Sequence, residues 1–277
     1  MEPILILAKV TIAALVAAGL VLFAAARLGD GGRPRRFAGA ALIAALMGGY
    51  IGQYGLPALP FGEDQLRAHA RLFWVLPVGL IATLLPWRRA LLPIAALVPL
   101  VVMKAFDGGE RDALEWLSLG GLVLAFCVVT ATGDLVFRRR DGAHAAVQLG
   151  LFAGAAAGII GATGTMAYAQ WAGALGTAWG LTVLLAWRAK DAGRLDGATL
   201  ALFASGFVLL ATRYSELDPF DAALLIGVLP MTVLAEDFLE GRRARTAVSW
   251  LVLLAVLATV ALRVYLAWES DPYADYY

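Results

Sequence analysis

Cysteine and histidine are almost absent from this sequence. Cys127 is the only cysteine, and His69 and His144 are the only histidines among 277 residues. A single cysteine excludes an intramolecular disulfide and a cluster of thiolate ligands. Two histidines far apart in the sequence argue against a haem pair or a histidine-rich metal site. We therefore predict that the protein holds no metal and no cofactor.

Charged side chains are also scarce. They make up 16% of the chain, whereas 61% of its residues are hydrophobic; soluble domains carry about 25% charged residues. The sequence contains no glycine-rich phosphate loop, no His-Glu-x-x-His and no paired acidic motif for prenyl chemistry. We predict no catalytic residue and no nucleic-acid partner, and the absence of these motifs argues against an enzyme without excluding one.

Apolar runs of membrane-spanning length fill most of the chain. About 20 residues of helix cross a bilayer, and only helices or closed barrels satisfy the backbone there. These runs are too long and too continuously apolar for barrel strands. We predict an all-α polytopic membrane protein of about ten transmembrane helices in one domain, 1–277. The predicted spans are residues 4–26, 37–55, 70–87, 90–106, 114–137, 145–168, 170–188, 197–213, 220–239 and 247–268.

Lysine and arginine are distributed unevenly between alternate loops. Of the 22 basic residues, 15 fall on one side, in clusters that include Arg36, Arg140 and Arg243. Basic loops stay in the cytoplasm, so we predict that this side is cytoplasmic and that both termini face outward. Abundant alanine and arginine are typical of a GC-rich bacterial genome, and we expect a bacterial inner membrane.

A stripe of glycines marks the middle of the chain. Gly150, Gly154, Gly158 and Gly161 share one face of a helix. In lipid, a glycine groove lets helix backbones approach closely. The stripe predicts that 145–168 is the central packing helix of the bundle.

Two prolines indicate an inverted 5+5 repeat. Pro99 and Pro230 lie in similar apolar segments, and Trp116 and Trp250 open the spans that follow them. The halves would be 1–140 and 141–277, and paired helix breaks in such halves mark the binding site of many carriers. Chance is the alternative, because apolar helices resemble one another.

Ionisable residues at membrane depth are candidates for function. Four basic residues lie a few residues inside the outer end of predicted spans: Lys9, Lys104, Arg213 and Arg263. Together they would line an outward vestibule for an anionic solute or a lipid headgroup. Alternatively, they snorkel to the headgroups or form ion pairs. Their candidate partners are Glu115, Glu216, Asp218 and Glu269.

Glu236 lies at the inner end of the span that contains Pro230. It is either a proton or cation site, or it compensates the charge of the basic loop that follows.

Three functions fit these observations. The first is a secondary carrier for a small, anionic solute, with its site between spans 90–106 and 220–239 and the glycine helix. Lys104 would lie at the outer mouth and Glu236 near the inner mouth, with Pro99 and Pro230 as the paired helix breaks. The second is a structural or assembly subunit whose glycine grooves contact a partner membrane subunit. A lipid-modifying membrane enzyme is the third. A polar cavity at mid-membrane favours the carrier, and a dry bundle favours the subunit.

Overall fold

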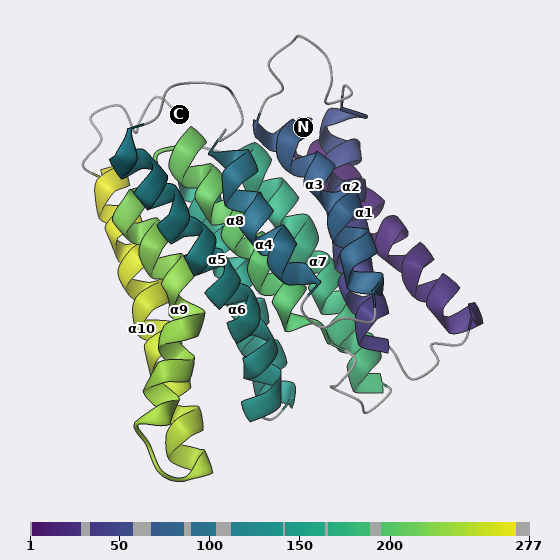
Figure 1. Cartoon of the computed structure of the whole chain (residues 1–277). Helices are drawn as coiled ribbons and strands as arrows, with labels where there is room; N and C mark the ends of the chain where they lie inside the picture. Colours follow the sequence, from purple (N-terminus) through teal and green to yellow (C-terminus); the bar gives the residue numbers. More distant parts are fainter. Residues whose placement is uncertain are drawn as a thin grey trace.

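The protein is all-helical in the part of the chain that the computed structural model describes, residues 2–28, 34–57, 68–85, 90–103, 112–140, 142–163, 166–188 and 195–269. Ten helices are described there (Figure 1). They are α1 (Glu2–Leu28), α2 (Pro34–Tyr54), α3 (Ala68–Leu84), α4 (Leu91–Val102), α5 (Ala113–Arg139), α6 (Gly142–Ala162), α7 (Met166–Arg188), α8 (Gly197–Tyr214), α9 (Pro219–Asp237) and α10 (Arg242–Glu269).

Each predicted span coincides with one helix, which confirms the all-α fold class. Seven helices, α1, α2, α5, α6, α8, α9 and α10, are long and apolar enough to cross a membrane. The chain is therefore a multi-pass membrane protein, and the crossing of all ten helices stays a prediction. Figure 1 shows that α1 begins and α10 ends at the same end of the bundle.

Aspartate side chains fix the start of three helices. Asp112 accepts a hydrogen bond from the Glu115 amide at 2.7 Å at the start of α5. Asp218 accepts one from the Phe220 amide at 2.7 Å, just before a proline opens α9. Asp196 caps α8 in the same way. These caps satisfy amide groups that a helix cannot pair internally.

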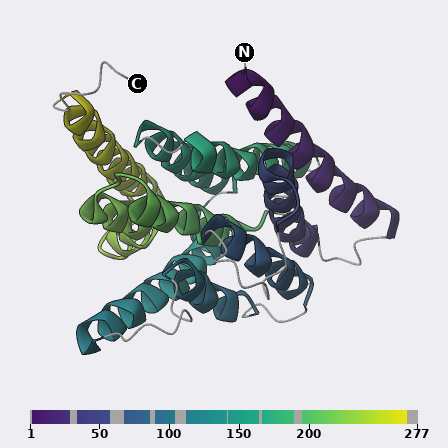
Figure 2. The same ribbon diagram turned by 90° about the horizontal axis from the view of Figure 1, so that it is seen from above.

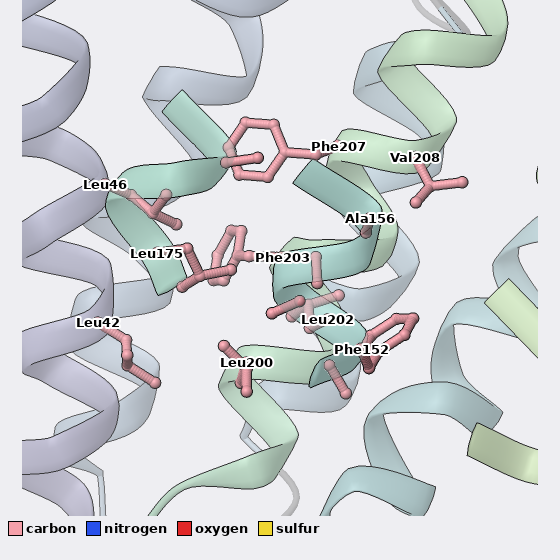
Figure 3. Close-up of a cluster of buried hydrophobic side chains, with 14 of the residues drawn as sticks. Leu42, Leu46, Phe152, Ala156, Leu175, Leu200, Leu202, Phe203, Phe207 and Val208 are labelled. Atoms are coloured by element: carbon pink, nitrogen blue, oxygen red, sulfur yellow. The ribbon is translucent and has the colours of Figure 1, made fainter. Parts of the chain in front are cut away.

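Helix α8 is the centre of the bundle. All of its residues from 197 to 211 are buried, and α2, α4, α5, α6, α7 and α9 pack around it. Figure 3 shows its apolar side chains, among them Phe203 and Phe207, between Leu46 of α2 and Phe152 of α6. Seen from above, α1 and α10 lie at opposite edges (Figure 2). The centre of the bundle is therefore filled mainly by apolar side chains.

The glycine stripe of α6 lies elsewhere than predicted. Gly154 and Gly158 are exposed, and an added Cβ would have no atom within 4 Å. Gly150 and Gly161 contact α7, where an added Cβ would lie 3.2 Å from Trp179 and 3.3 Å from Ala169. The prediction that this helix is the centre of the bundle is wrong, because its 154 and 158 positions are turned away from every described neighbour.

Close helix contacts depend on other glycines. Gly133 of α5 and Gly197 of α8 lie backbone to backbone, so that a Cβ on either would overlap the carbonyl oxygen of the other. Gly48 of α2 lies against α1, and a Cβ there would be 2.5 Å from the Ala13 carbonyl oxygen. Small residues of this kind let membrane helices pack closely.

We expect Gly133→Ala and Gly154→Ala to have opposite effects on stability. The first forces a methyl group into the α5–α8 contact and should cost about 1–3 kcal/mol. The second adds a methyl group in open space and should be neutral or stabilise the helix by up to about 1 kcal/mol. Thermal unfolding of both variants in the same detergent measures the difference, and equal melting temperatures would contradict the described contact.

Candidate functional site

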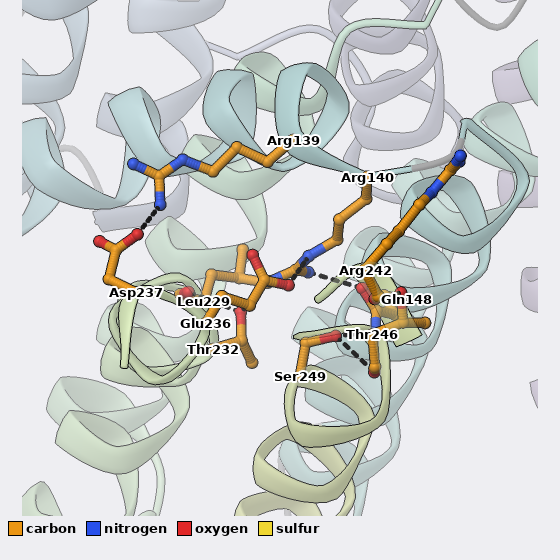
Figure 4. Close-up of polar contacts among 10 residues, drawn as sticks. All are labelled: Arg139, Arg140, Gln148, Leu229, Thr232, Glu236, Asp237, Arg242, Thr246 and Ser249. Carbon is orange, nitrogen blue, oxygen red and sulfur yellow. Dashed lines mark hydrogen bonds and ion pairs between the residues drawn. The ribbon is translucent and has the colours of Figure 1, made fainter. Parts of the chain in front are cut away.

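The densest polar cluster lies at the end of the bundle where α5 and α9 end and α6 and α10 begin, called here the basic end. Arg140 follows α5, and only 3% of its side chain is exposed. Its Nε donates to Glu236 Oε1 at 2.6 Å, its Nη1 to Gln148 Oε1 at 2.5 Å and its Nη2 to Thr232 Oγ1 at 2.8 Å (Figure 4). One side chain thus connects the end of α5 with α6 and α9.

Hydrogen bonds continue from this cluster into α10. Gln148 Nε2 donates to Ser249 Oγ at 3.1 Å, and the Ser249 hydroxyl donates to the Thr246 carbonyl at 2.9 Å. The Thr232 hydroxyl donates to the Leu229 carbonyl at 2.8 Å. The polar side chains around Arg140 are therefore joined in one network across four helices.

A second cluster joins α2, α5 and α8 at the same end. Arg35 donates to Asp134, which also accepts from Arg138 one turn along α5. Arg35 Nη2 also lies 3.8 Å from Asp196 Oδ1. The Thr199 hydroxyl donates to the other oxygen of Asp196 at 2.7 Å. The cap of α8 is thereby tied to the ion pair between α2 and α5.

Burial shifts the ionisation of both clusters. It lowers the pKa of the Arg140 guanidinium, and the hydrogen bond and charge of Glu236 oppose this change. It raises the pKa of Asp196, while Arg35 and Thr199 act in the opposite direction. Arginine stays protonated in proteins, so Arg140 and Glu236 form a buried ion pair.

Glu236 therefore has a partner that neither predicted interpretation named. It pairs with Arg140 at the end of α5, whereas the charge-compensation interpretation assigns it to the basic loop before α10. Its neighbour Asp237 pairs with Arg139, with 2.5 Å between Oδ1 and Nη1. The run of three arginines at 138–140 and the isolated Gln148 within an apolar helix are the sequence signals that mark this cluster.

The described members of the predicted basic vestibule are not all brought together. Lys9 and Arg213 are exposed on α1 and α8. Arg263 lies on α10, at the opposite edge of the bundle from α1 (Figure 2). Its Nε pairs with Asp221 Oδ1 at 2.6 Å and its Nη2 with Asp218 Oδ1 at 3.9 Å, so pairing within the bundle is confirmed for this residue. Lys104 lies outside the described residues.

The prolines do not face one another either. Pro99 is buried in α4 and Pro230 is half-buried in α9. Among the described residues, α4 and α9 share no substantial helix contact; each packs against α5 and α8. The described contacts therefore do not bring α4 and α9 together, and the site between α4, α9 and α6 stays a prediction. The inverted repeat stays a prediction.

Two buried polar atoms lack a hydrogen-bond partner in the described structure, Ser205 Oγ and Gln53 Oε1. Ser205 is fully buried halfway along α8. The Gln53 amide of α2 donates through Nε2 to Gln170 Oε1 of α7 at 3.2 Å, at the end of the bundle opposite the basic end. Sequence reasoning missed Ser205, because a single serine among apolar residues is common in membrane helices.

In the described ranges, no group of three or more His, Cys, Asp or Glu side chains is placed to hold a metal ion. Comparison with protein-family models, with curated proteins and with solved structures finds no match to this chain. Function therefore rests on the geometry of the chain itself.

Arg140→Ala should destabilise the protein far more than Arg138→Ala. Loss of Arg140 leaves Glu236 buried without its partner, which costs about 3–5 kcal/mol. Arg138 is 48% exposed, and its i,i+4 pair with Asp134 contributes about 0.5 kcal/mol or less. Unfolding in nanodiscs measures both, and the double variant Arg140→Met/Glu236→Leu should recover most of the loss. Equal destabilisation by the two alanine variants would contradict the buried network.

Ser205 and Ser249 are both fully buried, so their alanine variants can be compared directly. Ser205→Ala removes a hydroxyl without a partner and should be neutral or stabilise the protein by about 1–3 kcal/mol. Ser249→Ala removes the group that accepts from Gln148 and should cost about 1 kcal/mol or more. Melting temperatures provide the measurement, and a larger loss from Ser205→Ala would show that its hydroxyl is satisfied.

Proposed function

We propose that this protein is a secondary carrier for a small solute and that the structure represents a state closed at its basic end. The observation that carries this proposal is a set of three ion pairs, called here the inter-half pairs. They join residues before position 141 to residues after it: Arg35–Asp196, Arg139–Asp237 and Arg140–Glu236. All three lie at the basic end, which the positive-inside rule places in the cytoplasm.

Among the contacts given for the described residues, the opposite end is held together differently. The polar contacts between the two halves that are described there are neutral ones. Gln53 donates to Gln170 at 3.2 Å, and the Tyr214 hydroxyl lies 3.5 Å from the Val102 carbonyl. In the part of the chain that is described, ion pairs between the halves at the basic end and neutral contacts at the other end support a bundle that opens first at the end opposite the basic end. Alternating access in carriers moves one half against the other.

A structural subunit is the second candidate, and two observations favour it. The centre of the bundle around α8 is continuous apolar packing, which resists the relative movement of helices. Gly154 and Gly158 of α6 and Gly176 of α7 leave open space at the surface, where a helix of another subunit would fit closely.

Movement of the halves separates the two candidates without knowledge of the solute. Cys127 is the only cysteine, so Cys127→Ala provides a background for spin labels. One label pair, at Ala26 and Phe238, reports on the basic end, and another, at Leu114 and Glu216, reports on the opposite end; all four positions are exposed. Distances are measured in nanodiscs by double electron–electron resonance.

For a carrier, Arg139→Gln and Glu236→Gln should lengthen the distance at the basic end and shorten it at the opposite end, because the closed state loses inter-half pairs. Arg188→Gln removes a charge at the same end outside these pairs and serves as the control. Arg139→Gln breaks a pair at the surface, so this variant folds even if the buried substitution does not. If the label distances are unchanged in a folded Arg139→Gln variant, the proposal of a carrier is overturned and the structural subunit is favoured.

A further inference from the structure

Asp196, the cap of α8, is a buried acid whose charge is only partly compensated. Its side chain is 8% exposed. The Thr199 hydroxyl donates to Oδ2 at 2.7 Å, and the Thr199 amide donates to Oδ1 at 3.4 Å. Its basic partner in the described structure is Arg35, whose Nη2 lies 3.8 Å from Oδ1, too far for a hydrogen bond. A buried carboxylate without closer compensation takes up a proton more readily than one in water.

Arg35 is shared unequally between two acids. It donates to Asp134, and Asp134 also accepts from Arg138. The side chain of Asp134 is 21% exposed and therefore less buried than that of Asp196, yet it has the closer arginines. The more deeply buried acid thus has the weaker partner. A proton on Asp196 removes its charge and leaves Arg35 with Asp134.

Helix α2 lies directly against the Asp196 carboxylate. Gly39 is buried there, and a Cβ on it would overlap Asp196 Oδ2 and lie 3.1 Å from Thr199 Oγ1. On the side of α5, the backbone contact between Gly133 and Gly197 closes the start of α8. The glycine at position 39 lets α2 approach so closely that no room for water remains between it and this oxygen. Both covering helices belong to the first half of the chain, whereas Asp196 belongs to the second.

Two described charges act on the ionisation of Asp196. Arg35 favours the ionised form and lowers the pKa, whereas Asp134 raises it. Burial is the larger effect, so the pKa of Asp196 lies above its ordinary value. The other charged groups described at this end, on the helices around the start of α8, either pair with other residues or are at least partly exposed. They are Arg36, Arg138, Arg139, Arg140, His144, Arg188, Glu236 and Asp237.

We propose that Asp196 binds a proton while the basic end is closed and releases it when the start of α8 separates from α2 and α5. Separation removes Gly39 from the carboxylate and admits water, which favours the ionised form. By linkage, closure favours proton uptake and the proton favours closure to the same extent. The release step rests on the proposed carrier, in which this proton is the coupled ion. The binding step requires only the closed structure.

The sign of the pH dependence follows from the raised pKa in the closed state. Below the ordinary pKa of an aspartate side chain, both states hold the proton and the contribution to closure is complete. As the pH rises from there through the closed-state pKa of Asp196, the closed state must give up its proton and this contribution is lost. The proposal therefore predicts that the basic end opens more easily at higher pH.

Infrared difference spectroscopy of the full chain in nanodiscs detects the proton directly, because a protonated carboxyl group has a C=O stretching band that an ionised one lacks. The band is followed through a pH titration. Asp196→Asn removes the acid and should still fold, because asparagine caps a helix as well as aspartate does. Asp221→Asn is the matched control, since Asp221 is a similarly buried acid whose Oδ1 lies 2.6 Å from Arg263 Nε.

We expect a carboxyl band that persists above the ordinary pKa of aspartate, is lost in Asp196→Asn and is retained in Asp221→Asn. Arg35→Gln should move the midpoint of the band to higher pH, because it removes the charge that favours the ionised form. Arg188→Gln removes an exposed charge at the same end and should leave the midpoint in place. The proposal is overturned if the wild-type protein lacks this band, if Asp196→Asn retains it, or if Arg35→Gln moves it to lower pH.

The spin-label pair at Ala26 and Phe238 tests the release step. The distance at the basic end should lengthen as the pH rises through the midpoint of the band, and Asp196→Asn should keep it short at every pH. If Arg139→Gln lengthens this distance but pH does not, the release step is wrong although the carrier stands. If neither changes the distance while the band titrates, the carrier and the release step are both overturned, and Asp196 is a proton site in a static bundle.

Discussion

A charge inside an apolar bundle is stable only beside partners that the protein supplies, and this constraint is strongest at Arg140. Its guanidinium group has almost no contact with solvent and directs three donors at Glu236, Gln148 and Thr232. Each acceptor comes from a different position in the chain, so the network forms only when α5, α6 and α9 are in place. The cost of leaving one member of such a pair buried without its partner holds these helices in a fixed relation.

Close approach of helix backbones is the second constraint. The contact between Gly133 and Gly197 brings α5 against the start of α8, directly beside the cap formed by Asp196. This cap also lies near Arg35. The start of the central helix is therefore fixed by a steric contact on one side and by an ion-paired cap on the other. The helix beyond it needs only apolar side chains of suitable volume, which fill the centre of the bundle (Figure 3).

The positions of the helices follow from the sequence because apolar length is a local property. Every predicted span coincides with a described helix, and the basic clusters fall at one end. Which face of a helix meets a neighbour depends on its rotation within the bundle, and a pattern of glycines does not determine that rotation. The exposed Gly154 shows the error that results. The position of a helix within the plane of the membrane is also not determined by the sequence pattern. Lys9 and Arg263 lie at a similar predicted depth, but their helices, α1 and α10, are at opposite edges of the bundle. The Arg140–Glu236 pair joins residues 96 positions apart, so no local pattern reveals it.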